Sequence, residues 1–191
     1  MSTVLPDIVD DIDLDQIFQD AVAQITGLDG SMVVERFQPI PTRRPEVSDD
    51  WCAVGVISAE SDDTPIIQAA DDPSQVLFID HERLDVLASF YGPKGSNTAK
   101  RLRDGIKIPQ NMEALKANGI YLTDARRIQR VGALVNQQFQ NRYDLGLVFM
   151  RRVERLYPIG RFESVQIHIF DDHPQNKPVF DRIIEIVPPN T

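Results

Sequence analysis

The sequence predicts an α+β fold, in which a mainly antiparallel or mixed β-sheet is covered by an N-terminal helix and one or two central helices. Apolar residues recur at helical spacing in residues 13–26, which indicates an amphipathic helix. Two long segments, 75–91 and 138–157, instead alternate apolar and polar residues, as half-buried strands do. Glycines and prolines separate these segments, and no internal repeat is evident, so we expect a single packed unit.

The first predicted element is a helix that begins at Asp13. A carboxylate at this point can accept hydrogen bonds from the free N–H groups of the first turn. Gly27 and Gly30 are expected to end the helix, because glycine is a common helix stop. The helix would bury one side, formed by Leu14, Ile17, Phe18, Ala21, Val22 and Ile25.

Four extended segments follow, at residues 32–37, 51–58, 66–69 and 75–91. The run WCAVGVIS at 51–58 is almost wholly apolar and indicates a buried strand. The segment 75–91 is expected to be one long strand with a break, because Leu84, Val86, Ala88 and Phe90 share one parity.

The central region predicts a helix at about residues 97–106, with Ser96 or Asn97 as its N-terminal cap. Pro109 breaks it, and a second short helix at 110–118 ends at Gly119. Residues 120–135 are expected to be partly extended.

Residues 138–157 form the clearest predicted strand. Tyr143, Leu145, Leu147, Phe149, Val153 and Tyr157 share one parity, and Arg142, Asp144, Arg152 and Glu154 share the other. A hairpin across residues 158–162 would pair this strand with 165–169. The sheet would then hold about five or six strands, close to the mean for a sheet.

The length and the composition of the chain suit one domain. Of 191 residues, 42% are hydrophobic and 26% charged, so the chain can build a core. We expect an N-terminal arm at 1–12, a single α+β domain at 13–172 and a C-terminal arm at 173–191. The acidic start lacks the basic region of a signal peptide, and no long apolar run predicts a membrane span. The single Cys52 favours assembly in a reducing cytoplasm.

The charge is distributed unevenly along the chain. Residues 1–90 hold 19 acidic and 4 basic side chains, a net of -15, and residues 91–191 hold 10 and 16, a net of +6. If these charges lie on separate faces, one copy can meet the next head to tail, which closes into a ring where the rotation permits. The alternative is that the two halves interleave in the fold and the asymmetry disappears in space.

No constellation of residues predicts catalysis, a cofactor or a metal site, so we do not expect an enzyme. Asp80-His81-Glu82 and Asp171-Asp172-His173 lack metal-ligand spacing, and a turn or strand end is the simpler interpretation of each. The loop 92–98 departs from the phosphate-loop pattern. Cys52 lies in an apolar run, where a buried inert thiol is expected.

Basic residues concentrate in the second half of the chain and raise the possibility of DNA binding. No recognition helix or aromatic platform accompanies them, and the whole chain is acidic. We therefore favour contacts between subunits or with a partner protein for Arg126, Arg127, Arg130, Arg142, Arg151, Arg152 and Arg155.

Three stretches together carry a resemblance to a known family. They are DWCAVGV at 50–56, SFYGP at 89–93 leading into RLRDGIKIPQNMEALKANGI at 101–120, and LVNQQFQNRYDLGLVFMRRVERLYPI at 134–159. In this order they resemble the neck and tail terminator family of tailed bacteriophages, over about residues 50–160. The most specific part is carried by Arg142, Asp144, Leu145, Phe149, Arg152, Val153, Arg155, Tyr157, Pro158 and Ile159.

The resemblance implies a structural virion protein of the tail or neck, without catalysis or cofactor. Such proteins form hexameric rings on the last ring of the tail tube, stop tail polymerisation and offer a joining surface to the head-side connector or neck protein. In contractile tails the tail sheath is a further partner, and DNA passes through the ring lumen without specific binding. The alternatives are another neck or head-completion protein that binds the connector, or a DNA-binding protein.

Overall fold

Two long strands form the centre of the fold, and every other strand pairs with one of them or with their direct neighbour. The computed structural model describes residues 11–38, 45–135 and 138–159. Strand β4 (Gln75–Tyr91) and strand β7 (Gln138–Pro158) are antiparallel, and their register runs without a shift from Gln75↔Pro158 to Tyr91↔Arg142. The apolar and polar alternation of both segments, read from the sequence, is thus the alternation of two faces of one sheet.

The remaining strands pair along the two outer edges of this pair. The sheet order is β1-β2-β4-β7-β5, with β3 also paired to β4 and β6 to β7. β1 (Val33–Glu35) runs parallel to β2 (Trp51–Ser61), and the other pairings are antiparallel. The described residues therefore form a mixed sheet of seven strands, completed by β3 (Ile66–Ala69), β5 (Ile120–Ala125) and β6 (Gln129–Val135).

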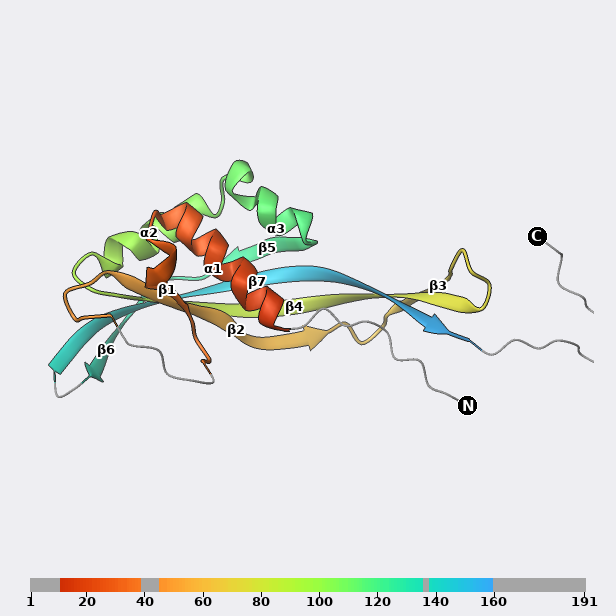
Figure 1. Cartoon of the computed structure of the whole chain (residues 1–191), viewed down its shortest axis with the longest axis horizontal. Coiled ribbons are helices and arrows are strands. Elements are labelled where there is room, and N and C mark those ends of the chain that lie inside the picture. Colours follow the sequence, from red (N-terminus) through yellow and green to blue (C-terminus); the bar gives the residue numbers. More distant parts are fainter. Residues whose placement is uncertain (1–10, 39–44, 136–137, 160–191) are drawn as a thin grey trace, which may run out of the picture.

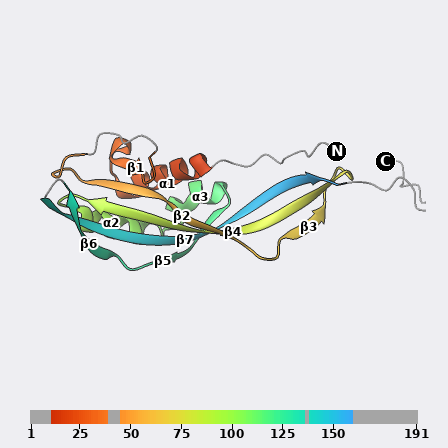
Figure 2. The same cartoon turned by 90° about the horizontal axis from the view of Figure 1, so that it is seen from below.

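Three helices cover one face of the sheet (Figures 1 and 2). They are α1 (Asp11–Thr26), α2 (Gly95–Gly105) and α3 (Glu113–Ala117), with single 3-10 turns at Gly30–Met32 (η1) and Pro109–Met112 (η2). The Phe18 ring of α1 packs against the Phe149 ring of β7 with centroids 5.0 Å apart. The core is formed where the helices meet the inward-facing residues of β4 and β7, among them Leu84, Val86, Ala88, Phe90, Leu145, Leu147 and Phe149.

The strands are longer than the helical layer, and part of the sheet projects beyond it. At about 3.3 Å per residue the 17 residues of β4 span roughly 56 Å, whereas the 16 residues of α1 span about 24 Å. Beyond the helices, β3 pairs with residues 76–79 of β4, and those residues pair with 154–157 of β7. We call this three-stranded extension, residues 60–82 and 152–159, the ribbon (Figures 1 and 2).

The start of α2 is fixed by a close approach of two loops. Gly92 has a φ of +93°, and a Cβ there would lie 2.3 Å from the carbonyl oxygen of Asp49, so this position requires glycine. The Lys94 amide donates to Asp50 Oδ1 at 2.7 Å. The loop 92–98 thus turns the chain from β4 into α2, and the carboxylate of Asp50 accepts a hydrogen bond from a backbone amide at the helix start.

The structure confirms the α+β class, the N-terminal helix, the central helices, and Gly27 and Gly119 as helix stops, both with positive φ. Several boundaries were wrong. α1 begins at Asp11 and not Asp13, α2 begins at Gly95 without a side-chain cap from Ser96 or Asn97, and β2 continues to Ser61. β4 has no break, because β7 pairs with it along its whole length.

Other expectations lie outside the described residues: the hairpin across 158–162 beyond Ile159, its partner strand 165–169, the Asp171–His173 segment, most of the N-terminal arm and all of the C-terminal arm. Among the helices that are described, none is both long and apolar enough to cross a membrane.

The Phe18 and Phe149 contact gives a direct test of the core. We expect Phe149→Ala to lower the free energy of unfolding by about 3–5 kcal/mol, because the substitution leaves a cavity under α1. Phe37→Ala is the matched control: Phe37 is 60% exposed, and its loss should change stability by less than about 0.5 kcal/mol. Urea unfolding monitored by circular dichroism measures both, and equal effects would contradict the assigned core.

Candidate functional site

Two of the predicted arginines meet one carboxylate on the helix-side face of the sheet. Arg151 Nη1 and Arg155 Nη2 lie 3.8 Å and 3.3 Å from the two oxygens of Glu82, and the three side chains are 12–18% exposed. Adjacent strands bring them together, since Glu82 pairs with Arg151 across β4 and β7. These two arginines therefore neutralise an acidic residue of the same chain.

A second polar network lies on the opposite face of the sheet. Arg36 donates to the hydroxyl of Ser89 at 2.9 Å, Ser89 donates to Asp144 at 2.7 Å, and Arg142 donates to the other Asp144 oxygen at 2.8 Å. Ser89 is fully buried, so its hydroxyl depends on these bonds in place of water. The Arg-x-Asp part of the resemblance thus forms a structural contact within the sheet, which Ser89 extends from β7 across β4 to Arg36.

The other four predicted arginines are scattered. Arg126 Nη2 lies 2.7 Å from Asp85 Oδ1, and Arg130 donates to Asn141. Arg152 forms an exposed pair with Glu154. Arg127 is exposed, and no ion pair of it is found within residues 11–38, 45–135 and 138–159.

The seven arginines do not form one patch. Strand alternation puts Arg151 and Arg155 on the helix side with Phe149 and Val153, whereas Arg142 and Arg152 lie on the other side. In the centre of the sheet the acidic first half and basic second half of the chain interleave, as one of our two alternatives expected. The role of the seven arginines in contacts with other subunits stays a prediction. Of the seven, only Arg127 is left without an ion-pair or hydrogen-bond partner in the described part of the chain.

Away from the sheet centre, opposite charges remain on separate parts of the molecule. Residues 60–82 of the ribbon contain seven acidic residues and no Lys or Arg, a formal net of -7. Residues 94–117, which form α2, η2 and α3, contain six basic and two acidic residues, a formal net of +4. Lys100, Lys107 and Lys116 are exposed there. The charge asymmetry of the sequence therefore survives between the ribbon and the α2–α3 part of the helical layer, whereas α1, with four aspartates and no basic residue, is acidic.

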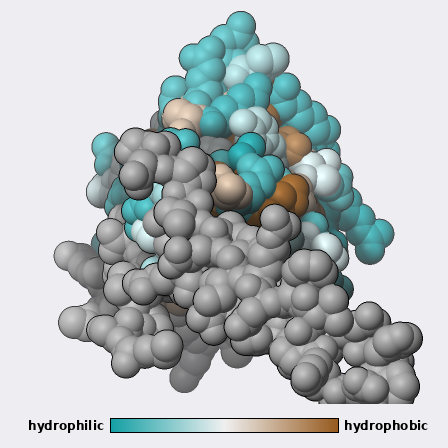
Figure 3. Space-filling model, turned by 90° about the vertical axis from the view of Figure 1, so that its right-hand side faces the viewer, coloured by the Kyte–Doolittle hydropathy of each residue, from teal (hydrophilic) through white to brown (hydrophobic). Residues whose placement is uncertain are grey.

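The ribbon also carries apolar side chains that the core does not cover. Ile67 is 65% exposed and Leu156 is 50% exposed, and Ile66 and Ile159 are exposed as well. Leu77 pairs with Leu156 across β4 and β7 on the face opposite the helices. Seen from the ribbon end, apolar patches interrupt a mostly hydrophilic surface (Figure 3).

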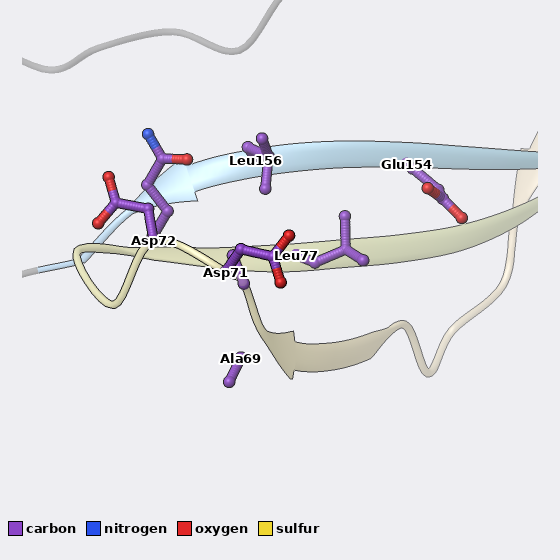
Figure 4. Close-up of a pocket in the computed structure, with 8 residues that line it drawn as sticks. Ala69, Asp71, Asp72, Leu77, Glu154 and Leu156 are labelled. Atoms are coloured by element: carbon purple, nitrogen blue, oxygen red, sulfur yellow. The ribbon is translucent and has the colours of Figure 1, made fainter. Parts of the chain in front are cut away.

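A hollow of about 620 Å³ opens beside this leucine pair. Its apolar floor comes from β4 and β7, and acidic side chains stand at its rim (Figure 4). We call it the ribbon hollow, and it is lined by Ala69, Ala70, Asp71, Asp72, Gln75, Leu77, Glu154 and Leu156. An apolar side chain flanked by a positive charge would match both the floor and the rim.

Our sequence reasoning missed this surface. A signal was present: VLFI at 76–79 is apolar at both parities, which predicts a strand covered on both faces. Ile66 and Ile67 on the neighbouring strand repeat the pattern. Only the structure shows that this apolar segment projects beyond the helices.

The Asp80-His81-Glu82 segment alternates between the two faces of the sheet. Asp80 and Glu82 lie on the helix-side face and His81 on the other, but all three are inside β4 rather than at a strand end or turn, so that expectation was wrong. In the described residues no group of three His, Cys, Asp or Glu side chains could hold a metal ion. Cys52 is fully buried, and burial raises the pKa of its thiol far above the ordinary value.

Comparison with known proteins identifies one family. A family model described as phage neck terminator protein matches residues 13–173. No curated protein matches the chain. The matched span includes all of the sheet from β1 to β7, the three helices except the first two residues of α1, and the ribbon.

The Glu82 cluster predicts a stability effect that an exposed pair lacks. We expect Glu82→Ala to lower the free energy of unfolding by about 3 kcal/mol, because it leaves two largely enclosed guanidinium groups without their carboxylate. Glu154→Ala is the control on the same two strands: its pair with Arg152 is about half exposed and should contribute about 1 kcal/mol or less. Urea unfolding measures both variants. Equal losses in the free energy of unfolding would contradict the stabilising role assigned to Glu82.

The buried thiol predicts resistance to modification. Because burial raises the pKa of Cys52, the thiolate is scarce in the folded chain. The neutral thiol therefore stabilises the fold fully below the unfolded pKa of about 8.5, and this contribution is lost only as the pH rises above that value toward the folded pKa. We expect a thiol reagent near that pH to leave the native chain unmodified and to label it fully in urea. Rapid labelling of the folded chain would show that Cys52 is accessible.

Proposed function

The chain belongs to the phage neck terminator family, and from that membership we propose that it forms a hexameric ring that caps the tail tube. In this role it ends tail polymerisation and provides the joining surface for the head-side connector. Family membership makes it a structural protein of the tail or neck of the phage virion, which interacts with other tail and neck proteins.

The observation that carries the proposal is the projecting ribbon. A domain that folds for itself alone has no need of a three-stranded extension with apolar residues exposed on it, since such side chains favour burial against another surface. Leu156 and Ile67 project from β7 and β3 well beyond the core. A surface of this kind suits a subunit that completes its packing in an assembly.

The internal pairing of the arginines supports a ring through which DNA passes without specific binding. Phosphate recognition requires guanidinium groups free to reach the backbone, and most of the predicted arginines contact acidic residues or Asn141 of their own chain. Further parts of the proposal are assembly in the host cytoplasm and, in a contractile tail, contact with the sheath.

The test is assembly of the full chain, alone and with the tail-tube subunit. We expect native mass spectrometry to give six copies, and negative-stain images to show rings and tubes capped at one end. Tubes grown from the tube subunit alone are the control and should lack caps and vary more in length.

A chain that stays monomeric and never binds a tube end would contradict the proposal. Copurification with tailless heads, together with absence from tube ends, would instead support the other neck role, in which the protein binds the connector from the head side.

A further inference from the structure

We propose that the ribbon hollow of one copy receives Ile108 of a second copy, and that this contact, repeated head to tail, joins neighbouring subunits. The inference rests on the proposed function, because it names the interface from which the ring would be built. It makes the second copy of this chain the partner of the ribbon.

Within the described residues the ribbon buries Ile79 but leaves Ile66, Ile67 and Leu156 exposed. Small sheets are stabilised by packing an apolar face against another layer, and here apolar side chains lie on both faces. Leu77 and Leu156 face away from the helical side, and Val76, Phe78 and Tyr157 face toward it. Phe78 and Tyr157 pack edge to face with centroids 5.5 Å apart, so the helix-side face has some packing of its own. The leucine face, which forms the ribbon hollow, is the one left to a partner.

The helical layer offers a side chain that fits. Ile108, between α2 and η2, is 48% exposed although it is a large aliphatic residue. Lys107 and Pro109 on either side of it are also exposed. We call Lys107, Ile108 and Pro109 the helical corner. It has the two properties that match the ribbon hollow, an apolar projection and an adjacent positive charge.

The charges of the two surfaces are complementary. Asp71 at the rim of the hollow is exposed, and residues 60–82 around it contain no Lys or Arg. The two arginines of the ribbon, Arg152 and Arg155, are paired with Glu154 and Glu82 of the same chain, so the ribbon as a whole remains acidic. Lys107, together with Lys100 on α2, belongs to the segment with the net charge of +4. Two copies of the ribbon would repel each other, as would two copies of the corner, so the charges favour contact between unlike surfaces.

The positions of the two surfaces suit repetition. The helical corner lies on the helical layer, whereas the ribbon projects beyond that layer at the far end of the sheet (Figure 1). One copy can therefore use its ribbon on one neighbour and its helical corner on another. Contacts of this unlike kind generate rings where the rotation closes, whereas a single self-complementary patch would stop at a dimer.

The test is a charge exchange between the two surfaces in the full chain. Asp71→Lys places two positive charges opposite each other, and Lys107→Glu places two negative ones. We expect each variant alone to weaken assembly at low ionic strength by about tenfold or more in dissociation constant.

An equimolar mixture of the two variants should recover. The Asp71→Lys chain carries a positive charge at position 71, which meets the negative charge at position 107 of the Lys107→Glu chain. At the alternate contacts the unchanged Asp71 of one chain meets the unchanged Lys107 of the other. Every contact then joins opposite charges, and native mass spectrometry should show mixed rings with equal numbers of the two chains.

A matched pair of substitutions tests the apolar part. Ile108→Asp should abolish assembly, because it puts a carboxylate into an acid-rimmed hollow. Ile57→Asp should leave assembly intact. Ile57 is equally exposed at 47%, but it lies at the register shift of β2 and belongs to neither the ribbon hollow nor the helical corner. Asp124→Lys on β5 is the corresponding control for charge. Circular dichroism and urea unfolding establish that the variants retain the fold.

The outcomes separate the two proposals. Wild-type rings that tolerate Asp71→Lys, Lys107→Glu and Ile108→Asp would overturn this interface and leave the terminator role standing. The same holds if single variants fail but their mixture does not recover, or if Ile57→Asp is as damaging as Ile108→Asp. A wild-type chain that remains monomeric, both alone and in the presence of tail tubes, would overturn both proposals.

Discussion

The pairing of β4 with β7 is the constraint on which the rest of the molecule depends. It joins residues 75–91 to 142–158 without a register shift, so one alternation of side chains extends along the whole sheet. That alternation decides which residues meet the helices, which face the opposite side and which carboxylate each arginine reaches. Glu82 meets Arg151 and Arg155 for this reason, and Ser89 meets Asp144 on the opposite face. A slip of one residue in β7 would exchange its two faces, which would put Arg142 and Asp144 against the core and move Arg151 and Arg155 away from Glu82.

The same pairing explains why, in the described part of the chain, the sheet extends beyond the helices. The helices cover only the part of the sheet that includes Leu84 to Phe90, and the two long strands continue past them. The strands are held there by each other and by β3, which provides backbone hydrogen bonds but no second layer. Apolar residues such as Leu156 and Ile67 are consequently exposed in the single chain. In a structural protein of the phage neck, this is the part of the fold that a partner can complete.

The sequence predicted what alternation and local stops determine, and it failed where distant segments meet. The face of β7 that carries Leu145, Leu147 and Phe149 was predicted, and so was the end of α1 at Gly27, because both depend on neighbours in sequence. The break expected in β4 does not exist, since β7 pairs with it throughout and supplies two arginines to Glu82 that no local pattern reveals. Among the residues of the resemblance, Arg152 faces away from Phe149 and Val153, and Arg151 shares their side. The arginines were found, but several of their partners were not, because those partners lie on β4.

Charge illustrates the same difference between sequence and space. The acidic first half and the basic second half suggested two faces, but β4 and β7 bring the halves together and neutralise much of that difference in the centre of the sheet. What remains is carried by segments that contribute little to this pairing: the acidic turns at either end of β3 and the basic α2 and η2 region. Since Leu156, which lines the ribbon hollow together with Asp71 and Asp72 of one of these turns, and Ile108 next to η2 are both exposed, charge and hydrophobicity select the same pair of surfaces. Two independent properties that converge in this way are a stronger basis for an interface than net charge, which by itself governs the rate and orientation of encounter more than the binding free energy.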